Sequence, residues 1–316
     1  MSNYNKHIIL GSGGAISKFL VNELKINNEN IKLASRSGKS WENSPAVRTD
    51  LLNREETFAA VEESSIVYLL AGIKYKTSEW EVQWPKIMQN TIDACIAKGA
   101  KLIFFDNVYP YGKVEGVMSE ETSLNPCSKK GEIRARLDEK ILDEIKRKNL
   151  NAIIARAADF YGPYSENSSI PVILVFNNLL KGKSAYWLVN SRSKHSFTYT
   201  GDCGKALYLL AKTDSAFNQV WHMPTAKPAL TGEEFISLAA KSLNVKPKFT
   251  ILNKWMVKLL GIFNWQIKEL YEMLYQNEFD YIFDSSKFEK EFKFKPTSYH
   301  DGILETADYL KGNTNK

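Results

Sequence analysis

The chain has 316 residues, of which 44% are hydrophobic and 25% are charged, and its formal net charge is +6. This length and composition indicate a globular protein with a sizeable core, either one large α/β domain or one domain with a smaller attached lobe. No apolar run approaches the roughly 20 residues of a membrane-spanning helix, and the charges are mixed in sign, so we expect neither a membrane partner nor a nucleic-acid partner.

The first half of the chain alternates short apolar runs with helical stretches. The strand-like runs are HIIL, IKLAS, AVRTDLL, SIVYLLAG, KLIFFDNVY and NAIIAR. Helices are expected over residues 16–24, from about 84 to 97 with Gly99 at the end, and over 133–147. Because the strands are apolar throughout and do not alternate, the pattern predicts a Rossmann-like, doubly wound parallel sheet with helices on both faces.

The second half, from about Ala157, lacks this regular alternation. It contains a short strand-like run, VWHMP, and a helix start at which Thr231 is the N-cap and Glu234 completes a capping box. We therefore predict a dinucleotide-binding domain over residues 1–160. Residues 161–316 are predicted to form mainly a small C-terminal α/β substrate lobe, from which some segments return to the first domain.

A glycine-rich turn follows the first strand and opens the first helix. Glycine allows the backbone to approach a pyrophosphate closely, and the helix N-terminus offers free N–H groups to the anion. In G-x-G-x-x-G spacing Gly11 and Gly13 match but Ile16 does not; in G-x-x-G-x-x-G spacing Gly11 and Gly14 match and Ser17 replaces the third glycine. The predicted cofactor contacts in this turn are Gly11, Ser12, Gly13, Gly14, Ala15 and Ile16.

The end of the second strand reads Ala34-Ser35-Arg36-Ser37. An NAD site usually has an acidic side chain here for the ribose 2′-hydroxyl, whereas an arginine complements the 2′-phosphate of NADP. Ser35 and Arg36 are therefore predicted cofactor contacts, with Ser37 and Lys39 as further donors. NADP(H) is the expected cofactor and NAD(H) the alternative.

The order of further motifs resembles that of extended short-chain dehydrogenase/reductase (SDR) proteins, and most closely their atypical, NAD-dependent epimerase/dehydratase-like subgroup. The motifs, which span essentially the whole chain, are the G-x-x-G turn, SR, TDLL, LLAG, Asn90, FFDNVYPYG, RAADFYGP, HSFTYTGD and DSSKFEKEF. The resemblance implies that Asp50 and Leu51 contact the adenine, and that Ala71 and Gly72 line the ribose and phosphates. It also implies cofactor contacts from Asn90, from Phe160 beside the nicotinamide, and from Lys129.

This sequence departs from the family at the positions of its catalytic residues. The family uses a Tyr-x-x-x-Lys pair at the start of the helix after the fifth strand, and a Ser or Thr directly after that strand. Here residues 125–131 read NPCSKKG, and no alignment puts Tyr and Lys in their places. We assign the role of the Ser or Thr after the fifth strand to Asn107 and proton transfer to Tyr109 or Tyr111. Lys129 or Lys130 would take the place of the family lysine.

Further residues are candidates for the substrate side. By the resemblance, Tyr161, His195, Tyr199 and His222 border the substrate lobe. His195 stands near the place where sugar-nucleotide enzymes of the family carry an arginine for the diphosphate, which argues against such a substrate. An aromatic cluster of Tyr75, Trp80 and Trp84 either lines an apolar pocket or packs in the core.

Three functions remain open. The first is an NADP(H)-dependent oxidoreductase acting on a small or medium carbonyl or alcohol; the others are a nucleotide-sugar epimerase or dehydratase, and a catalytically silent NADP(H)-binding sensor or scaffold. The three cysteines fit neither a metal site nor a disulfide framework, and the first strand leaves no room for a signal peptide. We therefore expect a cytoplasmic protein without a metal, and the resemblance allows a homodimer.

Overall fold

The computed structural model describes residues 6–314, which form two compact units. One unit, here called the sheet unit, comprises the chain up to Pro110 together with Lys130–Arg156 and Cys203–Trp221. The other, the lobe unit, comprises Tyr111–Lys129, Ala157–Asp202 and the chain from His222 onward. The units are interleaved in sequence, whereas the boundary predicted after residue 160 is a single cut, and that boundary remains a prediction.

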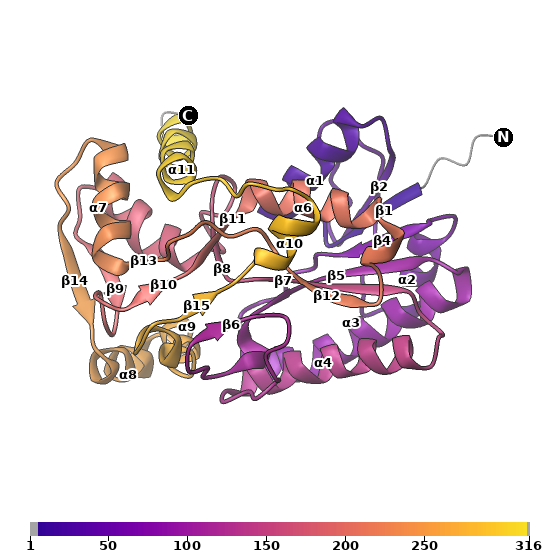
Figure 1. The fold of residues 1–316 in the computed structure, drawn as a ribbon, viewed down its shortest axis with the longest axis horizontal. Coiled ribbons are helices and arrows are strands. Elements are labelled where there is room, and N and C mark those ends of the chain that lie inside the picture. Colours follow the sequence, from indigo (N-terminus) through magenta and orange to yellow (C-terminus); the bar gives the residue numbers. More distant parts are fainter. Residues whose placement is uncertain (1–5, 315–316) are drawn as a thin grey trace. The chain divides into compact units, whose positions relative to one another are not determined.

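Seven strands of the sheet unit form one sheet in the order β12-β7-β5-β4-β1-β2-β3 (Figure 1). Strand β1 pairs in parallel with both β2 and β4, so the strand order reverses beside it. This confirms the predicted doubly wound parallel sheet, and ligands of such sheets bind at the carboxyl ends of the strands near the reversal. The strands are β1 (Lys6–Leu10), β2 (Asn30–Ser35), β3 (Ala46–Arg48), β4 (Ile66–Leu69), β5 (Lys101–Asn107), β7 (Ala152–Ala157) and β12 (Gln219–His222).

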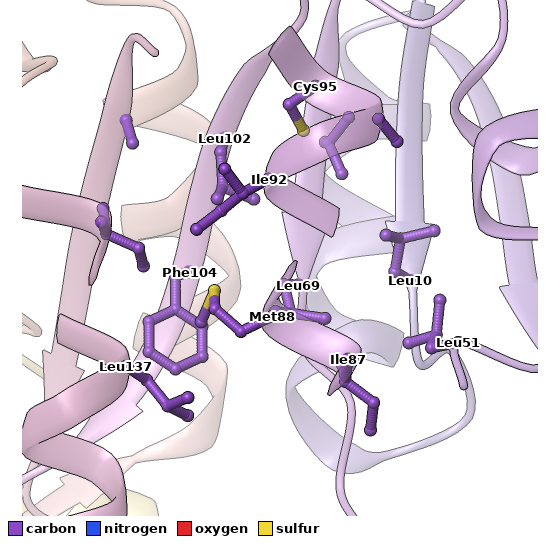
Figure 2. Packing of buried hydrophobic residues seen from close by; sticks show 14 of the residues in the cluster. Leu10, Leu51, Leu69, Ile87, Met88, Ile92, Cys95, Leu102, Phe104 and Leu137 are labelled. Atoms are coloured by element: carbon purple, nitrogen blue, oxygen red, sulfur yellow. The ribbon is translucent and has the colours of Figure 1, made fainter. Parts of the chain in front are cut away.

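Helices cover both faces of this sheet. Figure 1 shows α3 and α4 on one face and α1 and α6 on the other. In Figure 2, Met88, Ile92 and Cys95 of α3 lie against Leu69 and neighbouring side chains of the sheet, and this buried apolar contact stabilises the unit. The helices are α1 (Ala15–Ile26), α2 (Arg54–Val61), α3 (Thr77–Lys98), α4 (Lys129–Lys146) and α6 (Thr200–Ala211).

Helix α3 begins earlier than the sequence pattern indicates. A proline usually marks the first turn of a helix, because it lacks the N–H that would bond within the helix. Here Pro85 lies inside α3, and the helix begins at Thr77. The indoles of Trp80 and Trp84 are buried in the core, and this packing stabilises the turns before the proline. At the other end Gly99 adopts the left-handed conformation (φ +64°), which confirms the predicted helix end.

The lobe unit is built from short strand pairs and helices. β8 (Asp159–Tyr161) pairs with β11 (Phe197–Tyr199), β9 (Ala185–Leu188) with β14 (Phe249–Leu252), β6 (Val117–Met118) with β15 (Ile282–Phe283), and β10 (Lys194–His195) with β13 (Leu230–Thr231). Its helices are α5 (Asn177–Leu180), α7 (Gly232–Leu243), α8 (Lys254–Phe263), α9 (Trp265–Tyr271), α10 (Ser286–Glu291) and α11 (Tyr299–Thr314). The predicted capping box of Thr231 and Glu234 is present at the start of α7.

Candidate functional site

The glycine-rich turn lies at the carboxyl end of β1. Gly11 has φ +87°, and a Cβ there would overlap the backbone of Ala71, so glycine is needed for the close approach of two chain segments. The N–H groups of Gly11 and Ser12 both donate to the Ala34 carbonyl at the end of β2, at 2.8 and 3.1 Å. Protein packing therefore explains the first glycine of the motif without a ligand.

The next two glycines have a different surrounding. Gly13 and Gly14 are exposed, and a Cβ on either would meet no atom within 4 Å. Gly14 is the N-cap of α1, no side chain caps it, and the first turn contains no acidic residue. The hydroxyl oxygen of Ser12 is buried without a hydrogen-bond partner. An uncapped helix N-terminus, an open backbone and an unpartnered hydroxyl together fit a pyrophosphate.

The helix start is held by Ser17, which replaces the third glycine. Its hydroxyl accepts from the Gly13 N–H at 2.9 Å and donates to the Gly14 carbonyl at 2.8 Å. Ala15 and Ile16 are buried and pack toward the interior, so only their backbone is available to a ligand. The serine thus fixes the shape of the turn by hydrogen bonds.

The loop after β2 presents donors and no carboxylate over residues 35–39. Arg36 and Ser37 are exposed, and the hydroxyls of Ser35 and Ser37 lie 3.3 Å apart. The Arg36 side chain makes no hydrogen bond or ion pair with any described residue, and Lys39 is also exposed. This donor set fits a phosphate better than it fits a ribose hydroxyl.

The remaining predicted cofactor residues of the sheet unit lie along the same edge. Asp50 is half-buried and accepts from the Leu52 N–H at 3.0 Å, and Gly72 has open space where a side chain would be. Asn90 is buried on α3 and donates to the Leu51 carbonyl at 2.9 Å, which ties the loop after β3 to the helix. Asn90 therefore positions this loop.

A polar and aromatic group follows β5. The side-chain Oδ1 of Asn107 accepts from the Tyr109 N–H at 3.0 Å, and the Tyr109 hydroxyl lies 3.3 Å from that of Tyr75. Trp80 stacks on Tyr109 with ring centroids 6.5 Å apart and meets Tyr75 edge-on at 5.5 Å. The structure therefore joins one of the two predicted tyrosine donors to an aromatic cluster, and it adds Tyr75 as a second phenol.

Lys130, in the first turn of α4, is fully buried beside this cluster. Its ammonium donates to the Thr77 hydroxyl at 2.9 Å and lies 4.6 Å from the centroid of the Tyr75 ring. One turn later Arg134 reaches Asp106 at the end of β5, with Nε donating to Oδ1 at 2.6 Å. Lys130 and Arg134 form a basic i, i+4 pair on one face of α4, near the helix start at which the family resemblance implies a Tyr-x-x-x-Lys pair. The sequence pattern did not predict this pair, although its i, i+4 spacing is visible in the sequence.

Arg134 belongs to a buried ionic network. Asp106 also accepts from Arg156, at 3.3 Å, and Arg156 makes an ion pair with Asp138. All four side chains are almost completely buried. Burial raises the pKa of Asp138 above its ordinary value, against the opposing effect of Arg156. Arg134 is therefore held by structural partners.

Tyr111 and His222 form a buried pair within the lobe unit. The His222 Nδ1 lies 2.7 Å from the Asp284 carbonyl, which can only accept, so Nδ1 carries the proton. Nε2 then accepts from the Tyr111 hydroxyl at 2.7 Å. The hydroxyl proton of Tyr111 is thus committed to a histidine, which favours a structural role for both residues.

The other predicted lobe residues are also largely buried. Tyr161 and Tyr199 belong to the core of the lobe, and burial raises the pKa of Tyr161 above its ordinary value. Phe160 is half-buried on β8, and the backbone N–H of Lys129 donates to Glu272 at 2.8 Å. These placements favour packing over substrate contact for the two tyrosines.

His195 has one free ring nitrogen. Its Nε2 lies 3.1 Å from Oδ2 of Asp159, and the ring stacks on Phe197, whereas Nδ1 is buried without a hydrogen-bond partner.

The lobe unit also contains a groove of about 410 Å³. It is lined by Val117, Lys194, Ser196, Lys227, Pro228, Ala229, Asp280, Ile282, Phe283 and Asp284. None of the four predicted substrate residues lines that groove.

The part of the chain that the structure describes, residues 6–314, has neither a metal-ligand cluster nor a membrane-spanning helix. No group of three or more His, Cys, Asp or Glu side chains there could hold a metal ion. Within the same range, every helix is too short or too polar to cross a membrane.

Comparisons with known proteins agree with this architecture. No curated protein matches the sequence. Among solved structures, UDP-glucose 4-epimerase from Thermus thermophilus in complex with NAD is 16% identical, with a TM-score of 0.80 over 97% of this chain and 99% of that one. The dTDP-glucose 4,6-dehydratase from Bacillus anthracis str. Ames in complex with NAD is 17% identical, with a TM-score of 0.80 and 98% of both chains covered. UDP-glucuronic acid 4-epimerase from Bacillus cereus in complex with NAD is 18% identical, with a TM-score of 0.79 over 98% of this chain and 99% of that one.

At these identities the solved structures establish the fold alone. The family model described as the NAD dependent epimerase/dehydratase family matches residues 7–221, which is more than half of the chain. The sequence motifs, the parallel sheet and the turn at the end of β1 are consistent with that match. The protein therefore belongs to the NAD dependent epimerase/dehydratase family.

Proposed function

We propose that this protein is an NADP(H)-dependent oxidoreductase that interconverts a carbonyl and an alcohol. The observation that carries the proposal is the pairing of an open, uncapped α1 N-terminus with a carboxylate-free loop at the end of β2. The solved relatives with this fold are complexes with NAD, which supports a nicotinamide dinucleotide in general. The preference for NADP(H) rests on Arg36.

The residues present fit such a cofactor. The N–H groups after Gly13 and the hydroxyl of Ser12 would hold the pyrophosphate, and Arg36 with Ser35 and Ser37 would hold the 2′-phosphate. The loop of Asp50 and Leu51 would contact the adenine. When bound, the dinucleotide would supply or accept the hydride.

The proton would come from the group after β5. The side-chain Oδ1 of Asn107 accepts from the Tyr109 N–H, and its Nδ2 donates to no described residue. This nitrogen would therefore orient the substrate oxygen. Tyr109 would transfer the proton to that oxygen, with the Tyr75 hydroxyl 3.3 Å away as its second partner. The Lys130 ammonium beside Tyr75 would stabilise the negative charge that proton loss leaves on the phenol pair.

The first experiment is a titration of the protein with NADPH and then with NADH, followed by energy transfer from tryptophan to the nicotinamide. Arg36→Ala is expected to weaken NADPH binding by roughly tenfold to a hundredfold and to leave NADH binding unchanged, since it removes a charge-assisted contact. Arg192→Ala, whose side chain is 88% exposed in the lobe unit, is the matched control. Equal binding of both dinucleotides by the wild type would contradict the proposed NADP(H) preference, and no binding of either would contradict the cofactor site.

A carbonyl screen then tests the chemistry. Any reduced substrate allows Tyr109→Phe to be compared with wild type, and a loss of at least roughly a hundredfold in turnover with unchanged NADPH binding is expected for a proton donor. Tyr208→Phe, on α6, is the matched control. Wild-type turnover in Tyr109→Phe would assign proton transfer to another group.

The absence of a Tyr-x-x-x-Lys pair at the start of α4 favours a second candidate, a catalytically silent NADP(H)-binding protein. Lys129 and Lys130 follow Asn125 and Pro126 at four-residue spacing, and the Arg134 guanidinium one turn later is held by Asp106. Tight NADPH binding without turnover in a broad carbonyl screen would support this function.

The named relatives keep a third candidate open, a nucleotide-sugar epimerase or dehydratase. Such an enzyme recycles its dinucleotide and holds it tightly. Cofactor retained through purification would favour this function over the first, in which the dinucleotide exchanges.

A further inference from the structure

The helices α8 and α9 of the lobe unit carry a concentrated apolar surface. They pack against one another as a helical hairpin (Figure 1). Trp255, Leu259, Ile262 and Phe263 of α8 are 65%, 51%, 72% and 84% exposed, and Trp265 at the start of α9 is 43% exposed. We call these five residues the α8–α9 patch. Single exposed apolar residues are ordinary, but such a cluster marks an interaction surface.

Helical spacing puts the patch on one side of α8. Positions 255, 259, 262 and 263 follow the i, i+4, i+7, i+8 pattern of a single face. Val257 and Gly261 are buried and face the lobe. The helix therefore has one apolar face that packs inward and another that is largely exposed.

Lysines predominate among the charged residues around the patch. From Lys241 to Lys268 the chain contains six lysines and no aspartate or glutamate. All six are exposed, namely Lys241, Lys246, Lys248, Lys254, Lys258 and Lys268. Lys254 pairs with Glu278 at 2.6 Å, whereas Lys246, Lys248, Lys258 and Lys268 make no ion pair with a described residue. Glu269, which follows directly, is half-buried.

We propose that the α8–α9 patch inserts into the surface of a bilayer that contains anionic lipid. Aromatic and aliphatic side chains on one face of a helix, bordered by lysines, are the composition of helices that lie in the interface plane. The C-terminal end of α8 carries the most exposed members, Ile262 and Phe263, and would enter first. The lysines around it would meet the lipid phosphates.

The same charges argue against a second copy of the chain as the occupant. A symmetric contact would bring the patch of one copy onto the patch of another, together with both sets of unpaired lysines. Like charges held that close repel each other, whereas an anionic surface attracts them. No spanning helix is needed for this binding, so the proposal revises only the expectation that the protein has no membrane partner.

Vesicle flotation with the full chain tests the proposal. Wild-type protein is expected to float with vesicles of phosphatidylcholine mixed with phosphatidylglycerol, and at least several-fold less with phosphatidylcholine alone. The double variant Ile262→Ser/Phe263→Ser is expected to lose at least roughly tenfold in binding, because two apolar side chains no longer enter the bilayer. Lys248→Glu/Lys258→Glu is expected to lose the preference for the anionic vesicles.

Matched controls separate this effect from general surface changes. Ile26→Ser/Val82→Ser removes two apolar side chains of similar exposure, 72% and 70%, from α1 and α3 of the sheet unit, and is expected to float like the wild type. Lys205→Glu on α6 is the charge control. Thermal unfolding of each variant shows that it is folded.

Three results would overturn the proposal. Wild-type protein that stays at the bottom of the gradient with both vesicle types has no lipid-binding surface. A patch variant that floats like the wild type assigns any lipid binding to another surface. If the wild type self-associates without vesicles and the Ile262→Ser/Phe263→Ser variant does not, the occupant is a second copy and the lipid proposal is wrong.

Discussion

Two parts of the carboxyl edge of the sheet have kept different amounts of the family pattern. At the turn between β1 and α1, Gly11 and Gly14 follow the family spacing, and the backbone N–H groups at the helix start remain open. At the start of α4 the expected Tyr-x-x-x-Lys pair is absent, and Lys130 and Arg134 there are buried and bonded to Thr77 and Asp106.

The two parts differ because one would act through backbone atoms and the other through side chains. A pyrophosphate is held mainly by backbone N–H groups and a helix end, so the turn tolerates Ser17 in place of the third glycine. Proton transfer depends on particular side chains, so replacing them changes the chemistry while leaving the fold intact. The proposed binding and the proposed catalysis therefore depend on different atoms, and variants can test each part independently.

The largest expected effect is on stability at the α4 part. Asp106→Asn removes the negative charge shared by Arg134 and Arg156, and should lower the free energy of unfolding by about 3–5 kcal/mol, because two buried cations lose a partner. Urea denaturation measures this loss. Asp143→Asn, at an exposed pair with Lys146, should cost less than about 1 kcal/mol. Equal costs for the two variants would mean that the network does not hold α4 in place.

His7 lies at the amino end of β1, opposite the end that carries the glycine-rich turn, and should make stability depend on pH. Burial lowers the pKa of His7 from 6.5 to about 4, against the opposing effect of Glu29. The folded protein then binds fewer protons than the unfolded chain between these values, so stability should fall as the pH drops from about 6.5 to 4, by up to about 3 kcal/mol. Denaturation midpoints across this range measure the slope. His7→Gln should flatten it, and an unchanged slope would assign the acid sensitivity to other groups.

At the β1–α1 turn, a substitution should lower the affinity for the dinucleotide and leave the free energy of unfolding nearly unchanged. Gly14→Val fills the open space before α1, in a backbone conformation (φ −78°, ψ 171°) that any residue adopts. Binding of NADPH and NADH should both fall by roughly tenfold or more, which is about 1.4 kcal/mol, while the unfolding free energy stays nearly constant. The tryptophan energy-transfer titration and urea denaturation check the two halves. Unchanged binding would place the pyrophosphate elsewhere.

The smallest effect concerns the serine that replaces a family glycine. Ser17→Ala removes the two hydrogen bonds that join the side chain to Gly13 and Gly14, and should cost about 1 kcal/mol of stability. Thermal unfolding measures the loss, with Ser37→Ala in the exposed loop after β2 as the control. Equal melting temperatures for Ser17→Ala and the wild type would mean that the glycines alone shape the turn.

Local patterns were sufficient for much of the fold and for the position of the turn. The apolar strands, the capping box of Thr231 and the glycine end of α3 are each set by neighbouring residues, and the structure confirms them. The start of α3 was predicted too late, because the packing of Trp80 and Trp84 that extends the helix past Pro85 involves partners distant in sequence.

The candidate site divides in the same way. The sequence by itself determined the strand–glycine turn–helix unit and the arginine after β2, since these depend on spacing within a short segment. Only the tertiary structure brought Tyr75 beside Tyr109 and Lys130, committed Arg134 to Asp106 and committed Tyr111 to His222. Hydrogen bonds and buried ion pairs between distant segments depend on side-chain positions in space, and no periodicity along the chain records which partner a buried polar group will find.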